Sequence, residues 1–140
     1  MRVLLLAAAL ALASAGSARA DRCLGLSPAA PGYESVTVYF AVGSSALDDR
    51  ARAAIRRAAG QIVVQRKDHV CLIGRASPTG SPQENERLAA GRIRSVTDAL
   101  VAGGVPRLII GAQVQGAAWG LRIDRAENEA DRSVTILYPR

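Results

Sequence analysis

The segment from Gly74 to Val96, GRASPTGSPQENERLAAGRIRSV, places the strongest constraint on the fold of this chain. It follows the apolar, partly β-branched run His69 to Ile73, crosses a turn rich in Ser, Pro and Gly, and continues with a helical pattern. Ser81 is a favourable N-cap, Pro82 suits the first helical position, and Glu84 completes a capping box. The segment therefore predicts a strand, a loop and a helix in succession.

One face of the predicted helix carries three side chains of different chemistry. Asn85, Leu88 and Arg92 have the spacing i, i+3 and i+7, which places an amide, an apolar surface and a guanidinium in successive turns. A guanidinium offers a planar pair of donors that matches a carboxylate. We expect the loop, the helix start and Arg92 to line one pocket.

The spacing of Gly74, Gly80, Asn85, Leu88 and Arg92 resembles the signature of OmpA-like domains, which bind peptidoglycan in the periplasm of Gram-negative bacteria. The resemblance extends over about residues 36–138 and is weakest between residues 115 and 131. It implies a site for the diaminopimelate side chain of the peptidoglycan stem peptide. The ligand-binding residues that follow from the resemblance are Arg92, Ser77, Asn85, Ala76, Leu88 and Arg132.

The chain departs from this family at one position of the expected site. OmpA-like domains usually read Gly-His-Thr-Asp at the strand end, and the Asp and the helix Arg hold the amino acid end of diaminopimelate. This chain reads Gly74-Arg75-Ala76-Ser77. A charge-assisted hydrogen bond contributes about 1.5–3 kcal/mol and a neutral one about 0.5–1.5 kcal/mol, so Ser77 is expected to weaken binding about tenfold or more. The sequence leaves open whether Asp131, Asp124 or Glu127 supplies the missing anion.

The first twenty residues have the pattern of a secretory signal peptide. Arg2 is the positive start, residues 3–13 are apolar, and Ala18-Arg19-Ala20 is a small-x-small cleavage site. The apolar run is shorter than the about 20 residues needed to span a bilayer, and Cys23 lacks the preceding small apolar residues of a lipobox. We therefore expect a signal peptide at 1–20, an N-terminal arm at 21–35 and an OmpA-like domain at 36–140.

Charge and cysteine content restrict the remaining possibilities. The chain has 18 Lys and Arg against 12 Asp and Glu; two of the arginines lie in the signal peptide, which leaves a net charge of +4. The cations are scattered and few aromatic residues accompany them, which argues against nucleic acid binding. Cys23 and Cys71 are expected to form a disulfide in an oxidising compartment, the alternative being two free thiols. Two Cys and one His are too few ligands for a metal site.

The order of the predicted elements indicates a fold class. Strands are expected at Val36 to Phe40, Val70 to Arg75, Leu108 to Val114 and Ser133 to Tyr138. Helices are expected from about Leu47 to Val63 and from Pro82 to Ala102. The order β-α-β-α-β-β predicts an α/β (α+β) two-layer sandwich, with a mixed four-stranded sheet covered by two helices on one face.

Two functions fit these observations, and neither is catalytic. The chain has no Gly-rich phosphate loop, nucleophile elbow or metal cluster, so we expect no enzyme activity and no cofactor. The first hypothesis is a periplasmic module that binds peptidoglycan non-covalently and supports cell-envelope integrity, in association with the outer membrane. The alternative is a degenerate OmpA-like domain that serves as an envelope protein–protein interaction or structural module. Further candidate partners are outer-membrane or other envelope proteins, and no transmembrane segment is expected after signal cleavage.

Two single residues are not part of these hypotheses. His69 is expected at a surface strand edge, and the role of Trp119 is left open.

Overall fold

The computed structural model describes residues 22–116 and 128–140 of the chain. The regular elements are β1 (Tyr33–Tyr39), α2 (Asp49–Val64), β2 (Val70–Arg75), α3 (Pro82–Ala102), β3 (Ile110–Gln115) and β4 (Ser133–Pro139), with 3-10 turns η1 (Arg107–Ile109) and η2 (Glu129–Arg132). The expected signal peptide, Trp119, Asp124 and Glu127 lie outside the described residues. No helix in the described ranges is long and apolar enough to cross a bilayer.

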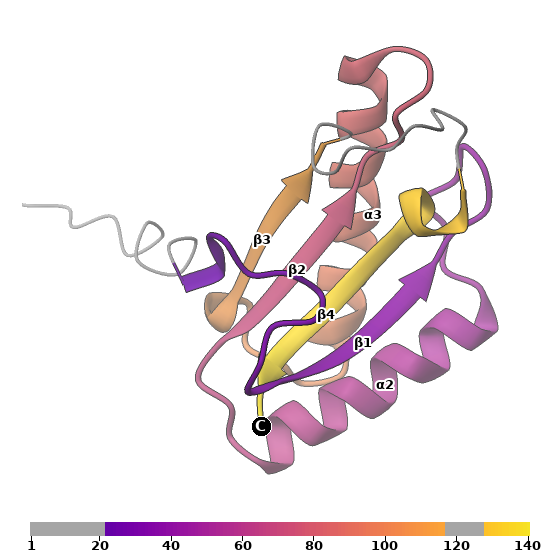
Figure 1. Ribbon diagram of the computed structural model, residues 1–140. Helices are drawn as coiled ribbons and strands as arrows, with labels where there is room; N and C mark the ends of the chain where they lie inside the picture. Colours follow the sequence, from indigo (N-terminus) through magenta and orange to yellow (C-terminus); the bar gives the residue numbers. More distant parts are fainter. Residues whose placement is uncertain (1–21, 117–127) are drawn as a thin grey trace, which may run out of the picture.

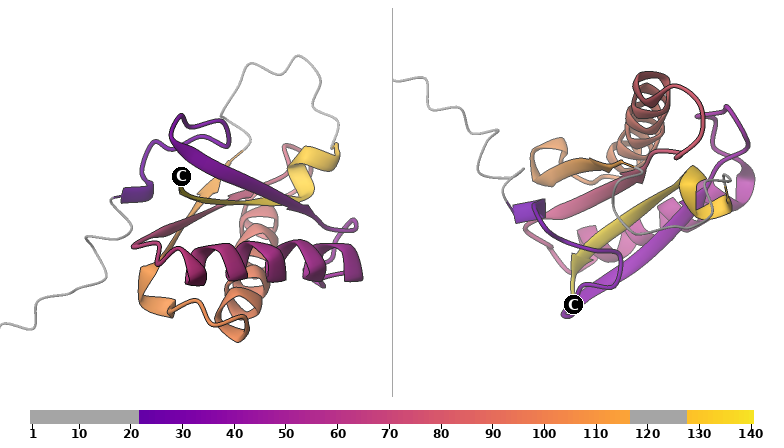
Figure 2. Two further views of the ribbon diagram at one scale, coloured as in Figure 1. Left: turned by 90° about the horizontal axis from the view of Figure 1, so that it is seen from below. Right: turned by 45° about the horizontal axis from the view of Figure 1, so that its top comes forward.

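The sheet has the strand order β1-β4-β2-β3 (Figure 1). β4 is antiparallel to both β1 and β2, whereas β2 and β3 are parallel, so the sheet is mixed. Both helices cover the same face, as the left view of Figure 2 shows. The predicted two-layer fold is therefore confirmed.

The core between the sheet and the helices is built from the apolar faces that the sequence periodicity predicts. It includes Val38, Ile55, Leu72, Val96 and Ile136, all at most 2% exposed. The caps are also local: the Asp48 carboxylate accepts from the Ala51 N–H at 2.7 Å, and the Ser81 hydroxyl accepts from the Glu84 N–H at 3.5 Å. These side chains satisfy N–H groups that have no partner within their helices.

Two strands begin at other residues than predicted, and the strand ends differ from the prediction by at most one residue. β3 begins at Ile110 rather than at Leu108, because residues 107–109 form a 3-10 turn after Pro106. β1 begins at Tyr33, inside the segment expected as an N-terminal arm, because Tyr33 pairs with Pro139 at the end of β4. The short turn η2 before β4 was not predicted.

The N-terminal arm covers part of the sheet face opposite the helices. Cys23 and Cys71 form the expected disulfide, with 5.5 Å between their Cα atoms. Both cysteines pack with Ile73 and Leu137, and Leu26 and Tyr33 lie against this second cluster. β2 is consequently buried on both faces, which explains its continuous apolar run.

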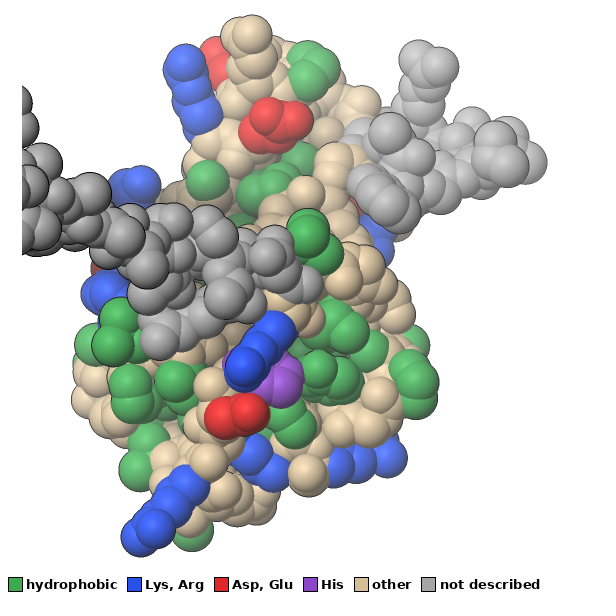
Figure 3. Space-filling model, turned by 90° about the vertical axis from the view of Figure 1, so that its left-hand side faces the viewer, with side chains coloured by type: hydrophobic (Ala, Val, Ile, Leu, Met, Phe, Trp, Pro, Cys, Tyr) green, Lys and Arg blue, Asp and Glu red, His purple; other side chains and the backbone are tan. Residues whose placement is uncertain are grey.

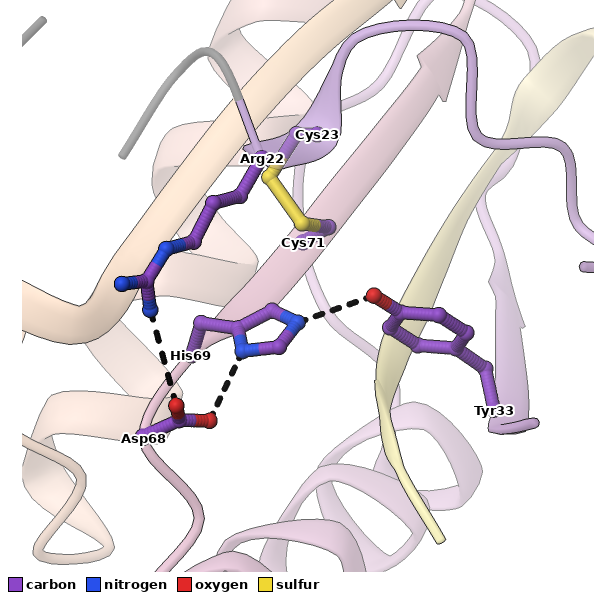
Figure 4. Close-up of polar contacts among 6 residues, drawn as sticks. All are labelled: Arg22, Cys23, Tyr33, Asp68, His69 and Cys71. Atoms are coloured by element: carbon purple, nitrogen blue, oxygen red, sulfur yellow. Dashed lines mark hydrogen bonds and ion pairs between the residues drawn. A yellow bond between two sulfur atoms is a disulfide. The ribbon is translucent and has the colours of Figure 1, made fainter. Parts of the chain in front are cut away.

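A chain of polar contacts lies beside the disulfide (Figure 4). Arg22 Nη1 lies 3.5 Å from Asp68 Oδ2, Asp68 Oδ1 lies 2.8 Å from His69 Nδ1, and His69 Nε2 lies 2.9 Å from the Tyr33 hydroxyl. The hydrogen bond from His69 is the main reason that the pKa of Asp68 falls below its ordinary value. Figure 3 shows acidic, cationic and histidine side chains together on this face. The His69 side chain is only 15% exposed, so its expected surface position is wrong: the Tyr33 ring, brought by β1, packs against it edge-on.

Candidate functional site

The predicted site residues gather at the end of the molecule where β2 stops and α3 starts, the upper end in Figure 1. The loop at 76–81, the loop at 40–48 and η2 meet there. Gly74 allows α3 to approach β2 closely, because a Cβ atom at this position would lie 2.8 Å from Ile93 Cδ1 and 3.3 Å from the Ala89 carbonyl oxygen. The first glycine of the pattern therefore fixes the distance between the strand and the helix of the site.

The loop at 76–81 is held by side chains of the predicted pattern. Asn85 Nδ2 donates to the carbonyl oxygens of Ser77, at 3.2 Å, and of Thr79. The Ser77 hydroxyl lies 2.9 Å from the Thr79 hydroxyl and accepts from the Thr79 N–H at 3.2 Å. Gly80 has a φ of +80°, a conformation that favours glycine. Asn85 thus sets the loop conformation from the helix, and Ser77 closes a local turn.

Arg92 is buried at 2% exposure and contacts the loop between β1 and α2. Its Nε donates to the Ser44 carbonyl oxygen at 2.8 Å, and its Nη2 donates to the Ala41 carbonyl oxygen at 3.2 Å. The guanidinium also lies over the Phe40 ring, 5.4 Å from the centroid. The side chain therefore fixes the loop at 40–45 and places a positive charge beneath the surface of this end.

Arg132 reaches the same loop from the other side. Its Nε donates to the Phe40 carbonyl oxygen at 3.1 Å, so Arg92 and Arg132 converge on consecutive parts of one loop. The neighbouring Asp131, one of three acids that the sequence left open as a replacement for the missing anion, is 2% exposed, and its Oδ2 accepts from the Asn128 N–H at 3.0 Å. Asp131 therefore caps η2 in this conformation.

A small cavity of about 70 Å³ lies beside the loop at 76–81. Ala76 and Ser77 line it, together with Gly116 and the exposed Glu86. Glu86 also lines a larger groove of about 510 Å³ with Arg87 and Val114, between α3 and β3. An anion therefore lines the same cavity as Ser77, which stands at the position of the family's Asp.

The structure thus divides the six predicted ligand residues into three groups. Ala76 and Ser77 line the small cavity. Arg92 and Arg132 hold the loop at 40–45, Asn85 holds the loop at 76–81, and Leu88 is half-buried on α3. Strand alternation places Arg75 on the face of Cys71 and Ile73, opposite the helices, so Arg75 and Arg92 do not share a pocket.

Glu86 and Arg87 were not singled out from the sequence. Both read as ordinary exposed residues of the second turn of a helix, where charged side chains are common on the solvent-facing side. Glu86 lines a cavity with Ala76, and both residues line a groove with Val114. These positions depend on how the loop at 76–81 and β3 pack beside α3. No local pattern carries that information.

Solved structures with the same fold confirm the architecture. The OmpA-like domain of FopA1 from Francisella tularensis has a TM-score of 0.66 and 16% identity, over 75% of this chain and 71% of that one. The peptidoglycan-associated lipoprotein from Burkholderia pseudomallei has a TM-score of 0.63 and 24% identity, over 73% and 88%. The periplasmic domain of Helicobacter pylori MotB has a TM-score of 0.63 and 16% identity, over 79% and 78%. None of the curated protein sequences matches this chain.

Comparison with protein-family models gives a direct assignment. The OmpA family model matches residues 39–134, which span the end of β1 to the start of β4 and include the whole candidate site. The signature from Gly74 to Arg92 lies inside this match and runs from β2 through the loop at 76–81 into α3. The chain therefore belongs to the OmpA family.

Proposed function

We propose that this chain is a non-catalytic periplasmic module that binds peptidoglycan non-covalently through the stem peptide. The observation that carries the proposal is the cavity that Ala76 and Ser77 line at the end of β2, inside the family match. Two proteins with this fold support the proposal: a peptidoglycan-associated lipoprotein and the cell wall anchor of the T6SS from Pseudomonas aeruginosa.

The chemistry of the cavity suits the amino acid end of diaminopimelate. This end is a zwitterion, so it needs an anion for its ammonium group and positive charge for its carboxylate. Glu86 is the anion that lines the cavity with Ser77, in place of the family's Asp. Arg92 contributes a buried positive charge and fixes the loop at 40–45. The rest of the stem peptide is assigned to the groove that Glu86 and Arg87 line.

The alternative function is an envelope interaction or structural module without peptidoglycan binding. It is favoured by the engagement of the Arg92 Nε and Nη2 groups with backbone carbonyls and by the neutral Ser77. On this alternative, the signature residues are retained because they hold two loops. Outer-membrane or other envelope proteins would then be the partners.

Co-sedimentation with insoluble peptidoglycan sacculi separates the two functions. The chain from Asp21 onward should pellet with sacculi, Arg92→Ala should abolish pelleting, and Ser77→Asp should strengthen it by about tenfold. Arg94→Ala removes an exposed arginine of the same helix and should leave pelleting unchanged. A natural chain that stays in the supernatant, with binding only in Ser77→Asp, would support the alternative.

A further inference from the structure

The edge of the sheet formed by β1 has unpaired backbone groups. β1 pairs only with β4, and no hydrogen bond reaches its outer edge from the described residues. Phe40 N–H donates to the Arg132 carbonyl, and the Gly32 carbonyl accepts from the Arg140 N–H, so both residues bond toward β4. Since direction alternates along an antiparallel strand, the even-numbered residues between them also bond to β4. The N–H and C=O groups of Ser35, Thr37 and Tyr39 therefore point outward.

This edge lacks the features that usually prevent pairing with another chain. Edge strands are commonly interrupted by proline, by a bulge or by charged side chains. β1 contains seven residues, YESVTVY, with no proline and a single charged residue, Glu34, and its register with β4 is continuous from Tyr33 to Tyr39. Both its length and its composition suit an additional strand.

A groove runs beside the edge, where α2 lies along β1 (Figure 1). It measures about 550 Å³ and is lined by residues 36–39 of β1 and by Arg50 and Arg57 of α2. Four exposed arginines, at positions 50, 52, 56 and 57, occupy α2, and none has an ion-pair partner among the described residues. Asp48 and Glu129 line the groove near Tyr39, but the Asp48 carboxylate is occupied as the α2 N-cap.

We propose that the outer edge of β1 binds an extended, acidic segment of a partner protein, which adds a strand to the sheet. The backbone groups of Ser35, Thr37 and Tyr39 supply the hydrogen bonds, and Arg50 and Arg57 select acidic side chains. A second copy of this chain fits poorly: two-fold pairing of β1 with β1 would put the two α2 helices side by side and their arginines against one another. The groove beside β1 shares no lining residue with the cavity and the groove assigned to the stem peptide, so the two proposals stand or fall separately.

Selection from a display library of random peptides, about ten residues long, tests the proposal with the whole chain from Asp21 onward. The enriched peptides should be acidic, rich in β-branched residues and free of proline. Ser35→Pro should lower their affinity by at least about tenfold, because it removes one outward N–H and leaves the bonds to β4 intact. Ser35→Ala keeps this N–H and should bind as the natural chain does.

Two charge variants give effects of opposite sign. Arg50→Glu with Arg57→Glu should weaken binding of the enriched peptides about tenfold, and Glu129→Lys should strengthen it. Arg94→Glu, on the other helix, is the matched control and should have little effect. Selection of basic peptides, or of none, would overturn the proposal, as would binding that is insensitive to Ser35→Pro.

Hydrogen exchange of single amides locates the bound peptide. In the free chain, the amides of Ser35, Thr37 and Tyr39 should exchange rapidly while those of Val36 and Val38 are protected; the bound peptide should slow the first group. If the amides of Ser35, Thr37 and Tyr39 are protected in the free chain, and if this protection grows with protein concentration, the edge binds a second copy of the chain. That result would overturn the assignment. Ser35→Pro should leave co-sedimentation with sacculi unchanged. A failure of the β1 edge proposal is therefore distinguishable from a failure of the proposed peptidoglycan binding.

Discussion

The guanidinium of Arg92 on α3 is hydrogen bonded to the carbonyl oxygen of Ser44, 48 positions earlier in the chain, at 2.8 Å. This bond joins the helix of the family signature to the loop that follows β1. Ser95 makes a second connection one turn later, since its hydroxyl donates to the Ser45 carbonyl oxygen at 2.7 Å. The signature arginine therefore has a role in loop structure whether or not a ligand is bound.

Replacing Arg92 should destabilise the fold. Arg92→Ala leaves the carbonyl groups of Ser44 and Ala41 without these bonds and removes the contact with Phe40, so the free energy of unfolding should fall by about 2–4 kcal/mol. Urea denaturation measures this change. Arg94→Ala should alter stability by less than about 0.5 kcal/mol. An equally small effect of Arg92→Ala would mean that the loop does not depend on Arg92.

A methyl group at position 74 should disturb the packing of α3 on β2. In Gly74→Ala the new Cβ would lie 2.8 Å from Ile93 Cδ1, which predicts a loss of stability of about 1–3 kcal/mol. Ile93→Val removes Cδ1 and should recover part of the loss in the double variant. The coupling energy from a double-mutant cycle measures this recovery. Strictly additive effects would show that the two residues do not meet.

Much of the fold could be predicted from the sequence because its signals are local. β2, the caps at Asp48 and Ser81, and the glycine that ends α3 depend on residues within a few positions of one another. The contacts of Arg92 could not be predicted, because they require the loop at 40–45 to fold over a helix that follows 48 residues later. The same holds for Glu86, whose cavity is also lined by Gly116, the residue that follows β3. The N-terminal arm lies on the sheet face opposite the helices because Cys23 is bonded to Cys71. This disulfide was predicted from the sequence.

The disulfide should contribute strongly to stability. It closes a segment of 48 residues, so replacing both Cys23 and Cys71 by alanine should lower the free energy of unfolding by up to roughly 4 kcal/mol on a chain-entropy estimate. The arm should then be cleaved by proteases under conditions in which residues 33–116 remain intact. Reduction of the natural chain under native conditions should give the same cleavage pattern. An arm that stays resistant after reduction would show that Leu26 and Tyr33 suffice to hold it.

The pair Asp68 and His69 should make stability depend on acid pH. The pKa of Asp68 in the folded chain is below its ordinary value of 3.8, chiefly through the bond from His69. The charged carboxylate therefore stabilises the fold at pH values above the ordinary pKa, and this contribution is lost as the pH falls through the lowered pKa. Asp68→Asn should lower the free energy of unfolding at neutral pH and should change it little at a pH below the lowered pKa of Asp68.

Urea midpoints at neutral and acid pH measure this dependence. Asp98→Asn is the matched control, because it removes an exposed ion pair with Arg107 at 3.0 Å and should have only a small effect. Equal losses for Asp68→Asn at both pH values would contradict the link between the carboxylate charge and stability.

An NMR titration of the chain with a soluble stem peptide that ends in diaminopimelate tests the proposed peptidoglycan site most directly. The amide signals of Ala76, Ser77, Gly116 and the first turn of α3 should shift and saturate. Glu86→Gln should weaken binding by about tenfold, whereas Glu84→Gln, an acid two positions earlier that does not line the cavity, should leave the affinity unchanged. The absence of saturable shifts, or shifts confined to β1 and α2, would contradict the assignment of the stem peptide to this cavity.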